Sequence, residues 1–123
     1  MDAKKFLAAC GGDYEGTMRR LMGNEMLFCR LLPKVFQDEN LQKLGDALSQ
    51  GNLEAAFDAA HTLKGMLGNL GLASLYDAVC EIVEPLRRKD SETDYSALYQ
   101  AIQREFLRLE TLLRQMEAGG TTK

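Results

Sequence analysis

Histidine is almost absent from this sequence, which holds one histidine, His61, among 123 residues. A metal site in a helical protein needs several histidine or carboxylate ligands from different helices, so one histidine argues against a metal centre. The three cysteines lie far apart without a C-x-x-C pair, which indicates neither a disulfide framework nor a zinc site. We therefore expect Cys10, Cys29 and Cys80 to stay reduced in a cytosolic protein.

Long apolar runs are also missing. No run approaches the ~18 apolar residues of a transmembrane helix, and the start Met-Asp-Ala-Lys-Lys leads into no secretory apolar stretch with a cleavage site. The net charge of −3 and the pI of about 5.2 give no general attraction to nucleic acid or to an anionic membrane. These absences predict a cytoplasmic protein that binds other proteins or small molecules.

Strand signals are scarce, because β-branched residues do not cluster and no sustained alternation of polar and apolar residues occurs. Apolar residues recur instead at spacings of three and four, which is typical of amphipathic helices. Helix-capping residues and glycines divide the chain. We expect two short helices opened by Asp2 and Asp13, then helices from Asn24 (bent or divided by Pro33), over 38–50, from Asn52 to Gly71, from Leu72 to Leu86 and from Tyr95 to Met116.

The predicted fold class is all-α. Short loops between long amphipathic helices favour an antiparallel (up-and-down) four-helix bundle with additional short N-terminal helices. A single domain is expected over residues 1–118, with residues 119–123 as a flexible tail. The basic run Arg87-Arg88-Lys89 is interpreted as a helix end, where cations interact favourably with the helix dipole.

The helix expected from Asn52 to Gly71 carries the histidine. On a helical wheel His61 lies on the shoulder of the apolar stripe, beside Gly65 and Gly68, and Lys64 follows it by one turn. Each glycine lowers helix stability by about 1 kcal/mol relative to alanine in a helix interior. Such a cost indicates that a ligand or another backbone approaches closely.

Several kinds of chemistry are excluded around His61. The glycines do not form a phosphate-binding loop, because G-x-x-x-x-G-K-[ST] and G-x-G-x-x-G are absent. The sequence places no partner for hydrolytic catalysis near the ring. A neutral imidazole can itself attack phosphorus if it is exposed, has a cation nearby and has free space around it, and His61, Lys64 and the glycines meet these needs. The same spacing also fits a partly buried structural histidine in a tightly packed helix pair.

The segment Ala60-His61-Thr62-Leu63-Lys64-Gly65, followed by Asn69-Leu70-Gly71, resembles the H-x-L-K-G-x(4)-L-G signature of histidine-containing phosphotransfer (HPt) domains. The resemblance covers roughly residues 13 to 116. It implies a helical bundle in which His61 accepts a phosphoryl group from a receiver-domain aspartate or a histidine kinase and relays it in a two-component phosphorelay. It also implies that Lys64 stabilises the phosphate charge and that Gly65 gives the partner access.

The same resemblance implies a phosphocarrier that is no enzyme, with no ATP site of its own, no metal and no cofactor, because Mg²⁺ comes with the receiver. The expected partners are a response-regulator receiver domain, a sensor histidine kinase or both, and the protein is expected to be a monomer. Receiver docking is expected to involve Phe57, Asp58, Met66 and Gly68, and Met66 stands where the family usually has a small residue. The alternative is a non-catalytic HPt-like bundle that binds or scaffolds a receiver without accepting phosphate.

Overall fold

The computed structural model describes the backbone of residues 1–121 and the side chains of residues 1–118. Within that range the chain is helical and has no strand, which confirms the predicted all-α class. The helices are α1 (Ala3–Ala9), α2 (Tyr14–Arg20), α3 (Glu25–Gln37), α4 (Asn40–Ser49), α5 (Leu53–Leu70), α6 (Ala73–Arg87) and α7 (Tyr95–Thr121).

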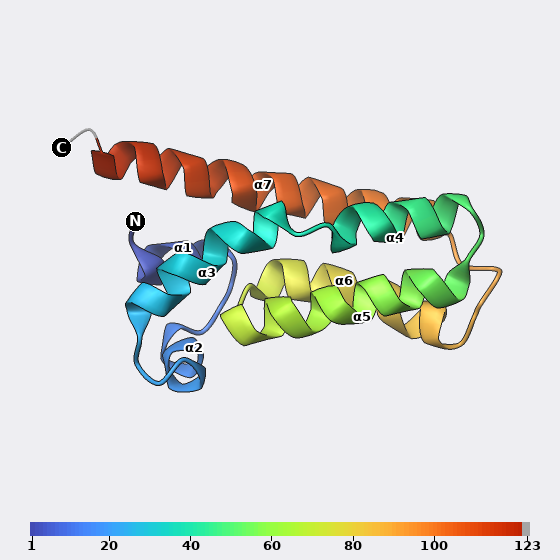
Figure 1. Ribbon diagram of the computed structural model, residues 1–123, viewed down its shortest axis with the longest axis horizontal. Helices are drawn as coiled ribbons and strands as arrows, with labels where there is room; N and C mark the ends of the chain where they lie inside the picture. The colour runs from blue at the N-terminus through green and yellow to red at the C-terminus, as the bar shows by residue number, and fades with distance from the viewer. Residues whose placement is uncertain (122–123) are drawn as a thin grey trace.

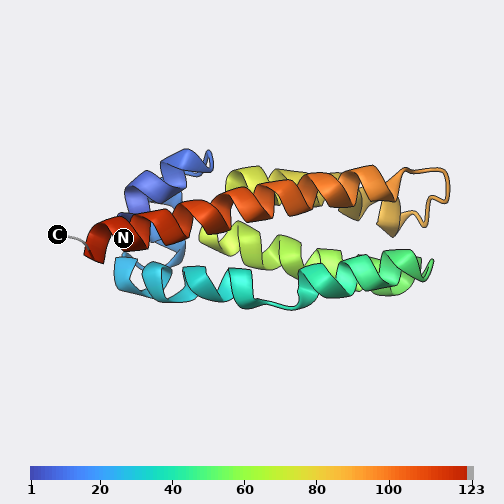
Figure 2. The same cartoon turned by 90° about the horizontal axis from the view of Figure 1, so that it is seen from above.

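Helices α4 to α7 form a bundle in which the chain reverses direction at each connection (Figure 1). Helix α5 packs against α4 on one side and α6 on the other, and α6 packs against α7. Helix α3 continues the line of α4, so that the two together run beside the long α7 (Figure 2). Helices α1 and α2 lie at the end of the bundle where α5 turns into α6 (Figure 1).

The boundary between α3 and α4 falls at Asp38, five residues after the proline expected to bend or divide this segment. Pro33 lies inside α3 and removes one backbone donor, but the helix continues because buried Leu32 and Val35 flank it on the core side. Asp38 has extended backbone with ψ 140°. Its carboxylate accepts hydrogen bonds from the backbone and side-chain nitrogens of Asn40 at 2.8 and 2.7 Å, which stabilises the start of α4.

Three helix starts match their predicted caps. Asp2, Asn24 and Asn52 each accept a hydrogen bond from the backbone N–H three residues later, at 3.1, 2.9 and 3.1 Å. Asp13 precedes α2 as expected but makes no capping hydrogen bond with its side chain. The helix boundaries therefore follow mostly from local hydrogen-bonding rules.

The core is built from aliphatic side chains of every helix, with few aromatic rings. Helix α1 contributes Phe6 and Leu7 to this core, and both side chains are completely buried. The largest fully buried side chains are Phe6, Leu7, Phe28, Leu32, Leu44, Leu63, Leu67, Leu72, Leu75, Ile82, Leu86 and Ile102. The N-terminal helices are thus part of one core with the bundle.

The turn that joins α5 to α6 is tightly enclosed. Gly71 ends α5 with a φ of 70°, a left-handed conformation that glycine adopts without strain. A Cβ atom at Gly71 would collide with the hydroxyl of Thr17, and a Cβ atom at Gly12 would collide with the carbonyl oxygen of Gly71. The backbone N–H of Ser74 donates to the carbonyl of Cys10 at 2.9 Å. The N-terminal helices therefore hold this turn through direct backbone contact.

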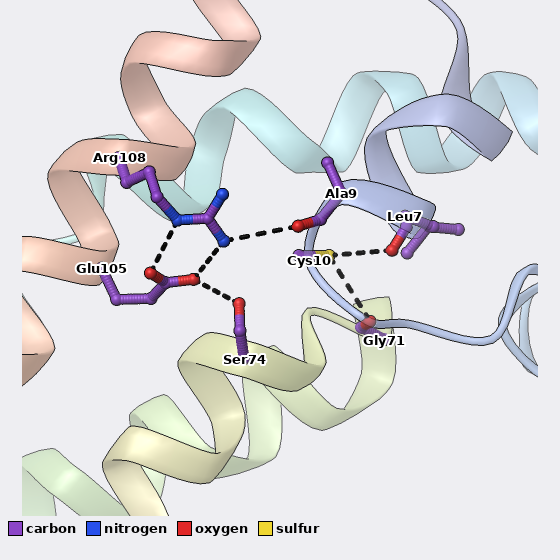
Figure 3. Close-up of polar contacts among 7 residues, drawn as sticks. All are labelled: Leu7, Ala9, Cys10, Gly71, Ser74, Glu105 and Arg108. Carbon is purple, nitrogen blue, oxygen red and sulfur yellow. Dashed lines mark hydrogen bonds and ion pairs between the residues drawn. The ribbon is translucent and has the colours of Figure 1, made fainter.

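A polar network continues from the turn to α7 (Figure 3). The hydroxyl of Ser74 donates to the carboxylate of Glu105. Arg108 donates to both oxygens of Glu105 at 2.8 and 2.6 Å, and to the carbonyl of Ala9 at 3.4 Å. The hydrogen bonds from Arg108 hold the pKa of Glu105 below its usual value, and the bond from Ser74 acts in the same direction. The network joins α1, α6 and α7.

The three cysteines are unpaired, as expected for reduced thiols. Cys10 is buried and its thiol donates to the carbonyl oxygens of Leu7 and Gly71 (Figure 3). Burial raises the pKa of the Cys10 thiol. Cys10 is therefore a small packing residue beside the α5–α6 turn.

Helix α7 continues to Thr121, three residues beyond the end of the domain predicted at residue 118. The first part of the segment expected as a tail is therefore helical backbone. The last two residues of that segment, 122–123, lie outside the described residues.

Candidate functional site

His61 lies in the middle of α5, at the margin of the exposed side of the helix, next to half-buried Phe57, Lys64 and Gly68. The opposite side of the helix is buried through Ala56, Ala60, Leu63 and Leu67. His61 itself is exposed. The shoulder position expected from the helical wheel is confirmed, and the alternative of a partly buried structural histidine does not fit this exposure.

A shallow depression of about 230 Å³ lies beside the imidazole. It is lined by His61, Lys64, Gly65, Gly68, Asn69 and Tyr76. Lys64 is half-buried, and among the described side chains no carboxylate forms an ion pair with it. The depression thus places a ring nitrogen of His61 beside a lysine that has no ion-pair partner among the described side chains. This arrangement is suited to binding an anionic group.

The two glycines of the depression differ in their surroundings. A Cβ atom at Gly65 would meet nothing within 4 Å, so this position is open to solvent. A Cβ atom at Gly68 would approach the ring of Tyr76 in α6 to 3.1 Å. Gly68 therefore serves the close packing of α5 on α6, whereas nothing inside the described molecule uses the space at Gly65.

The other residues expected at a docking surface surround the depression without lining it. The ring of Phe57 contacts the imidazole of His61, with centroids 5.4 Å apart. Asp58 is exposed, and its backbone carbonyl accepts a hydrogen bond from the hydroxyl of Thr62 at 3.0 Å. Met66 is half-buried and packs toward α2 and α3, where it lines a separate groove with residues such as Leu21 and Val35. The side chain of Met66 is therefore directed away from the depression.

Contacts of two residues of α6, Tyr76 and Arg87, with the histidine helix were not predicted from the sequence, although the spacing of residues about the α5–α6 turn relates them to it. Tyr76 lies over Gly68, and the guanidinium of Arg87 lies over the ring of Phe57 at 5.0 Å from its centroid. Gly68 and Tyr76 are three residues before and five residues after Gly71, and Phe57 and Arg87 are fourteen before and sixteen after it. Both pairs have the same register, as expected when two antiparallel helices pivot about one turn. Both pairs are symmetric about Leu72, the residue after the helix stop at Gly71, so a turn centred on Leu72 accounts for both contacts.

Neither a metal-binding cluster nor a membrane-spanning helix occurs within the described residues. Among them, no group of three or more histidine, cysteine, aspartate or glutamate side chains is placed to hold a metal ion. The same part of the chain contains no helix that is long and apolar enough to span a membrane.

Comparison with known proteins identifies the family. The family model of the Hpt domain matches residues 35–119. The crystal structure of histidine-containing phosphotransfer protein B (HptB) from Pseudomonas aeruginosa PAO1 is similar to this chain, with a TM-score of 0.73 and 28% sequence identity. The similarity covers 85% of this chain and 92% of that protein. No curated protein sequence matches the chain.

The match extends from the end of α3 through nearly all of α7 and includes the whole histidine helix. It leaves α1, α2 and most of α3 outside the family model. Because the matched region spans well over half of the chain and contains the depression beside His61, this protein belongs to the Hpt domain family.

Proposed function

We propose that this protein is a histidine phosphotransfer protein of a phosphorelay, and that His61 is the residue that carries the phosphoryl group. The observation that supports this assignment most directly is the depression that places Lys64 and the open Gly65 beside the exposed imidazole. Membership of the Hpt domain family and the likeness to HptB support the same function.

The proposed step is a direct displacement at phosphorus. The unprotonated ring nitrogen of His61 attacks the phosphorus of an aspartyl phosphate, and an N–P bond forms while the acyl O–P bond breaks. The bonding electrons return to the partner's aspartate as a carboxylate, and the imidazole releases its other ring proton to solvent. Lys64 stabilises the negative charge on the phosphoryl oxygens during the transfer. Transfer onward to another aspartate is the reverse of this step.

The partners that fit this chemistry are a receiver domain, a sensor histidine kinase or both. A receiver supplies the aspartyl phosphate together with Mg²⁺, so the protein needs no cofactor of its own. Gly65 leaves space for the partner's active site to reach the ring. We further propose that the protein acts as a monomer in the cytoplasm, without an ATP site and without binding nucleic acid or membranes.

The test is phosphate transfer from a phosphorylated receiver, or from an active kinase with ATP, to the wild-type chain and to His61→Gln. We expect the wild type to gain a phosphate that is labile in acid and stable in alkali, and His61→Gln to gain none. Thr62→Ala is a matched control, because Thr62 is the exposed neighbour and lies outside the depression. If the wild type binds receivers as tightly as His61→Gln does, and takes up no phosphate from any of them, the non-catalytic alternative is correct.

A further inference from the structure

The ring of Phe57 contacts two other side chains, those of Arg87 and His61. The guanidinium of Arg87, from the last turn of α6, lies over the ring of Phe57 at 5.0 Å from its centroid. The ring of Phe57 in turn contacts the imidazole at 5.4 Å between centroids, with 35° between the two planes. Phe57 therefore contacts both a cation on the neighbouring helix and the proposed phosphoacceptor.

Phe57 restricts the ring that has to react. It lies four residues before His61, so it projects from the same side of α5 one turn earlier. Because helical side chains lean toward the N-terminus, the imidazole leans onto the ring of Phe57. An exposed histidine in a helix otherwise exchanges between about two χ1 rotamers and roughly two χ2 orientations. Contact with the ring of Phe57 favours some of these imidazole orientations over the others.

Arg87 fixes Phe57 from the outside. Its Nε atom lies 3.4 Å from the carboxylate of Glu84 one turn earlier, so the guanidinium is tied to its own helix at one edge. The planar face is left to cover the aromatic ring, an arrangement that the ammonium group of lysine does not reproduce. The interpretation of Arg87 as part of a basic helix end is correct for its place in α6, but it leaves this contact out.

We propose that Phe57 is a positioning residue for His61, and that Arg87 holds Phe57 in the orientation that directs the imidazole toward the phosphoryl donor. This inference rests on the proposed function of His61. It differs from a docking role, because it concerns the orientation of the ring itself and acts even when no protein partner is present.

Phosphoramidate distinguishes a positioning role of Phe57 from a docking role, since it is a phosphoryl donor too small to need a docking surface. In this reaction the ring nitrogen attacks phosphorus, an N–P bond to His61 forms, and the P–N bond to the leaving group breaks to release ammonia. The imidazole then loses its other ring proton to solvent. The labelling rate at saturating donor measures how often the ring is correctly oriented, and a receiver is needed only for the parallel transfer assay.

We expect Phe57→Leu to slow labelling by phosphoramidate about two- to fourfold, the dilution expected when a single orientation is released into four. Phe57→Tyr keeps the ring and should restore the rate. Arg87→Gln should slow labelling in the same direction, whereas Arg88→Gln, which changes the adjacent exposed arginine, should not. A labelling rate of Phe57→Leu equal to the wild type would overturn the proposal. The proposal also fails if Phe57→Leu slows transfer from a receiver alone, because Phe57 is then a docking residue.

A second measurement does not depend on phosphate transfer. His61 is the one histidine of the chain, so its ring protons give the only imidazole signals in an NMR spectrum. We expect the ring current of Phe57 to displace these signals and Phe57→Leu to return them to the values of a free histidine. Arg87→Gln should move them part of the way. Signals that stay unchanged in Phe57→Leu contradict the positioning role, even if no donor phosphorylates the wild type and the proposed function itself fails.

Discussion

Gly65 and Gly71 lie six residues apart near the end of the same helix, yet their surroundings are opposite. At Gly65 an added side chain would meet open space, whereas at Gly71 it would collide with Thr17 and need a left-handed backbone. Gly71 is explained by contacts inside the molecule. Gly65 has no such explanation, and its cost to helix stability is understandable if a partner occupies the space. A glycine in a helix thus reports on function only when its neighbours fail to account for it.

The largest effect is expected at the enclosed end of the helix. Gly71→Ala should lower the free energy of unfolding by about 2–4 kcal/mol, because it combines a left-handed conformation with overpacking against Thr17. Gly51→Ala is the matched control, since Gly51 also has a positive φ of 69° but nothing within 4 Å of an added Cβ atom. It should lose about 1–2 kcal/mol. Equal losses in denaturant titrations would show that enclosure contributes nothing at Gly71.

The next largest effect concerns the positive charge of Lys64 in the depression beside His61. Lys64→Gln should slow phosphate transfer to His61 about tenfold, which corresponds to about 1.4 kcal/mol of transition-state stabilisation. Circular dichroism should show little change in helix content, because Lys64 is at the edge of the core. Lys5→Gln, on the exposed side of α1, is the control and should transfer at the wild-type rate. An unchanged rate in Lys64→Gln would remove Lys64 from the mechanism.

Gly65 itself gives a test in which stability and activity move in opposite directions. Gly65→Ala should raise the free energy of unfolding by about 1 kcal/mol, because alanine favours the helix and meets no neighbour. It should nevertheless slow transfer from a receiver severalfold while labelling by phosphoramidate continues. Gly68→Ala should be less stable than Gly65→Ala, because its methyl group approaches Tyr76. A Gly65→Ala protein that transfers at the wild-type rate would show that no partner approaches this position closely.

The smallest effect concerns the network beside the enclosed turn. Folding lowers the pKa of Glu105. The ionised carboxylate therefore stabilises the folded state at pH values above the pKa of glutamate in the unfolded chain. This contribution should be complete at neutral pH and disappear as the pH falls through the folded pKa. It should amount to less than about 1 kcal/mol, because Arg108 is half exposed. Glu105→Gln should have a weaker acid dependence of unfolding than the wild type, and identical pH profiles would contradict this role.

The features that the sequence predicted well are governed by neighbours along the chain. Capping by Asp2, Asn24 and Asn52 depends on atoms three residues away, and the stop at Gly71 depends on one backbone conformation. The exposure of His61 follows from the helical period. For the same reason the order of the helices was predictable, including a separate helix over the segment 38–50, although no break occurs at Pro33.

The features that were missed depend on how helices pack. The sequence treated Gly65 and Gly68 alike, because only the ring of Tyr76 in the next helix distinguishes them. Arg87 was assigned to a helix end, since its contact with Phe57 requires the register of α5 against α6. The docking role of Met66 stays a prediction, and only the packing of α2 and α3 shows that its side chain lines a separate groove. Such contacts follow from tertiary structure and not from local propensity.

The contacts between the N-terminal helices and the α5–α6 turn also have a consequence for the order in which the molecule folds. Helices α4 to α7 contact their neighbours in sequence, and such short-range pairs form quickly. Two hydrogen bonds at the end of α1 instead join residues far apart in the sequence, Cys10 with Ser74 and Ala9 with Arg108. Closing loops of this length costs more chain entropy and takes longer. The bundle that carries His61 is therefore expected to gain its shape first, and docking of the N-terminal helices should be the slowest stage of folding.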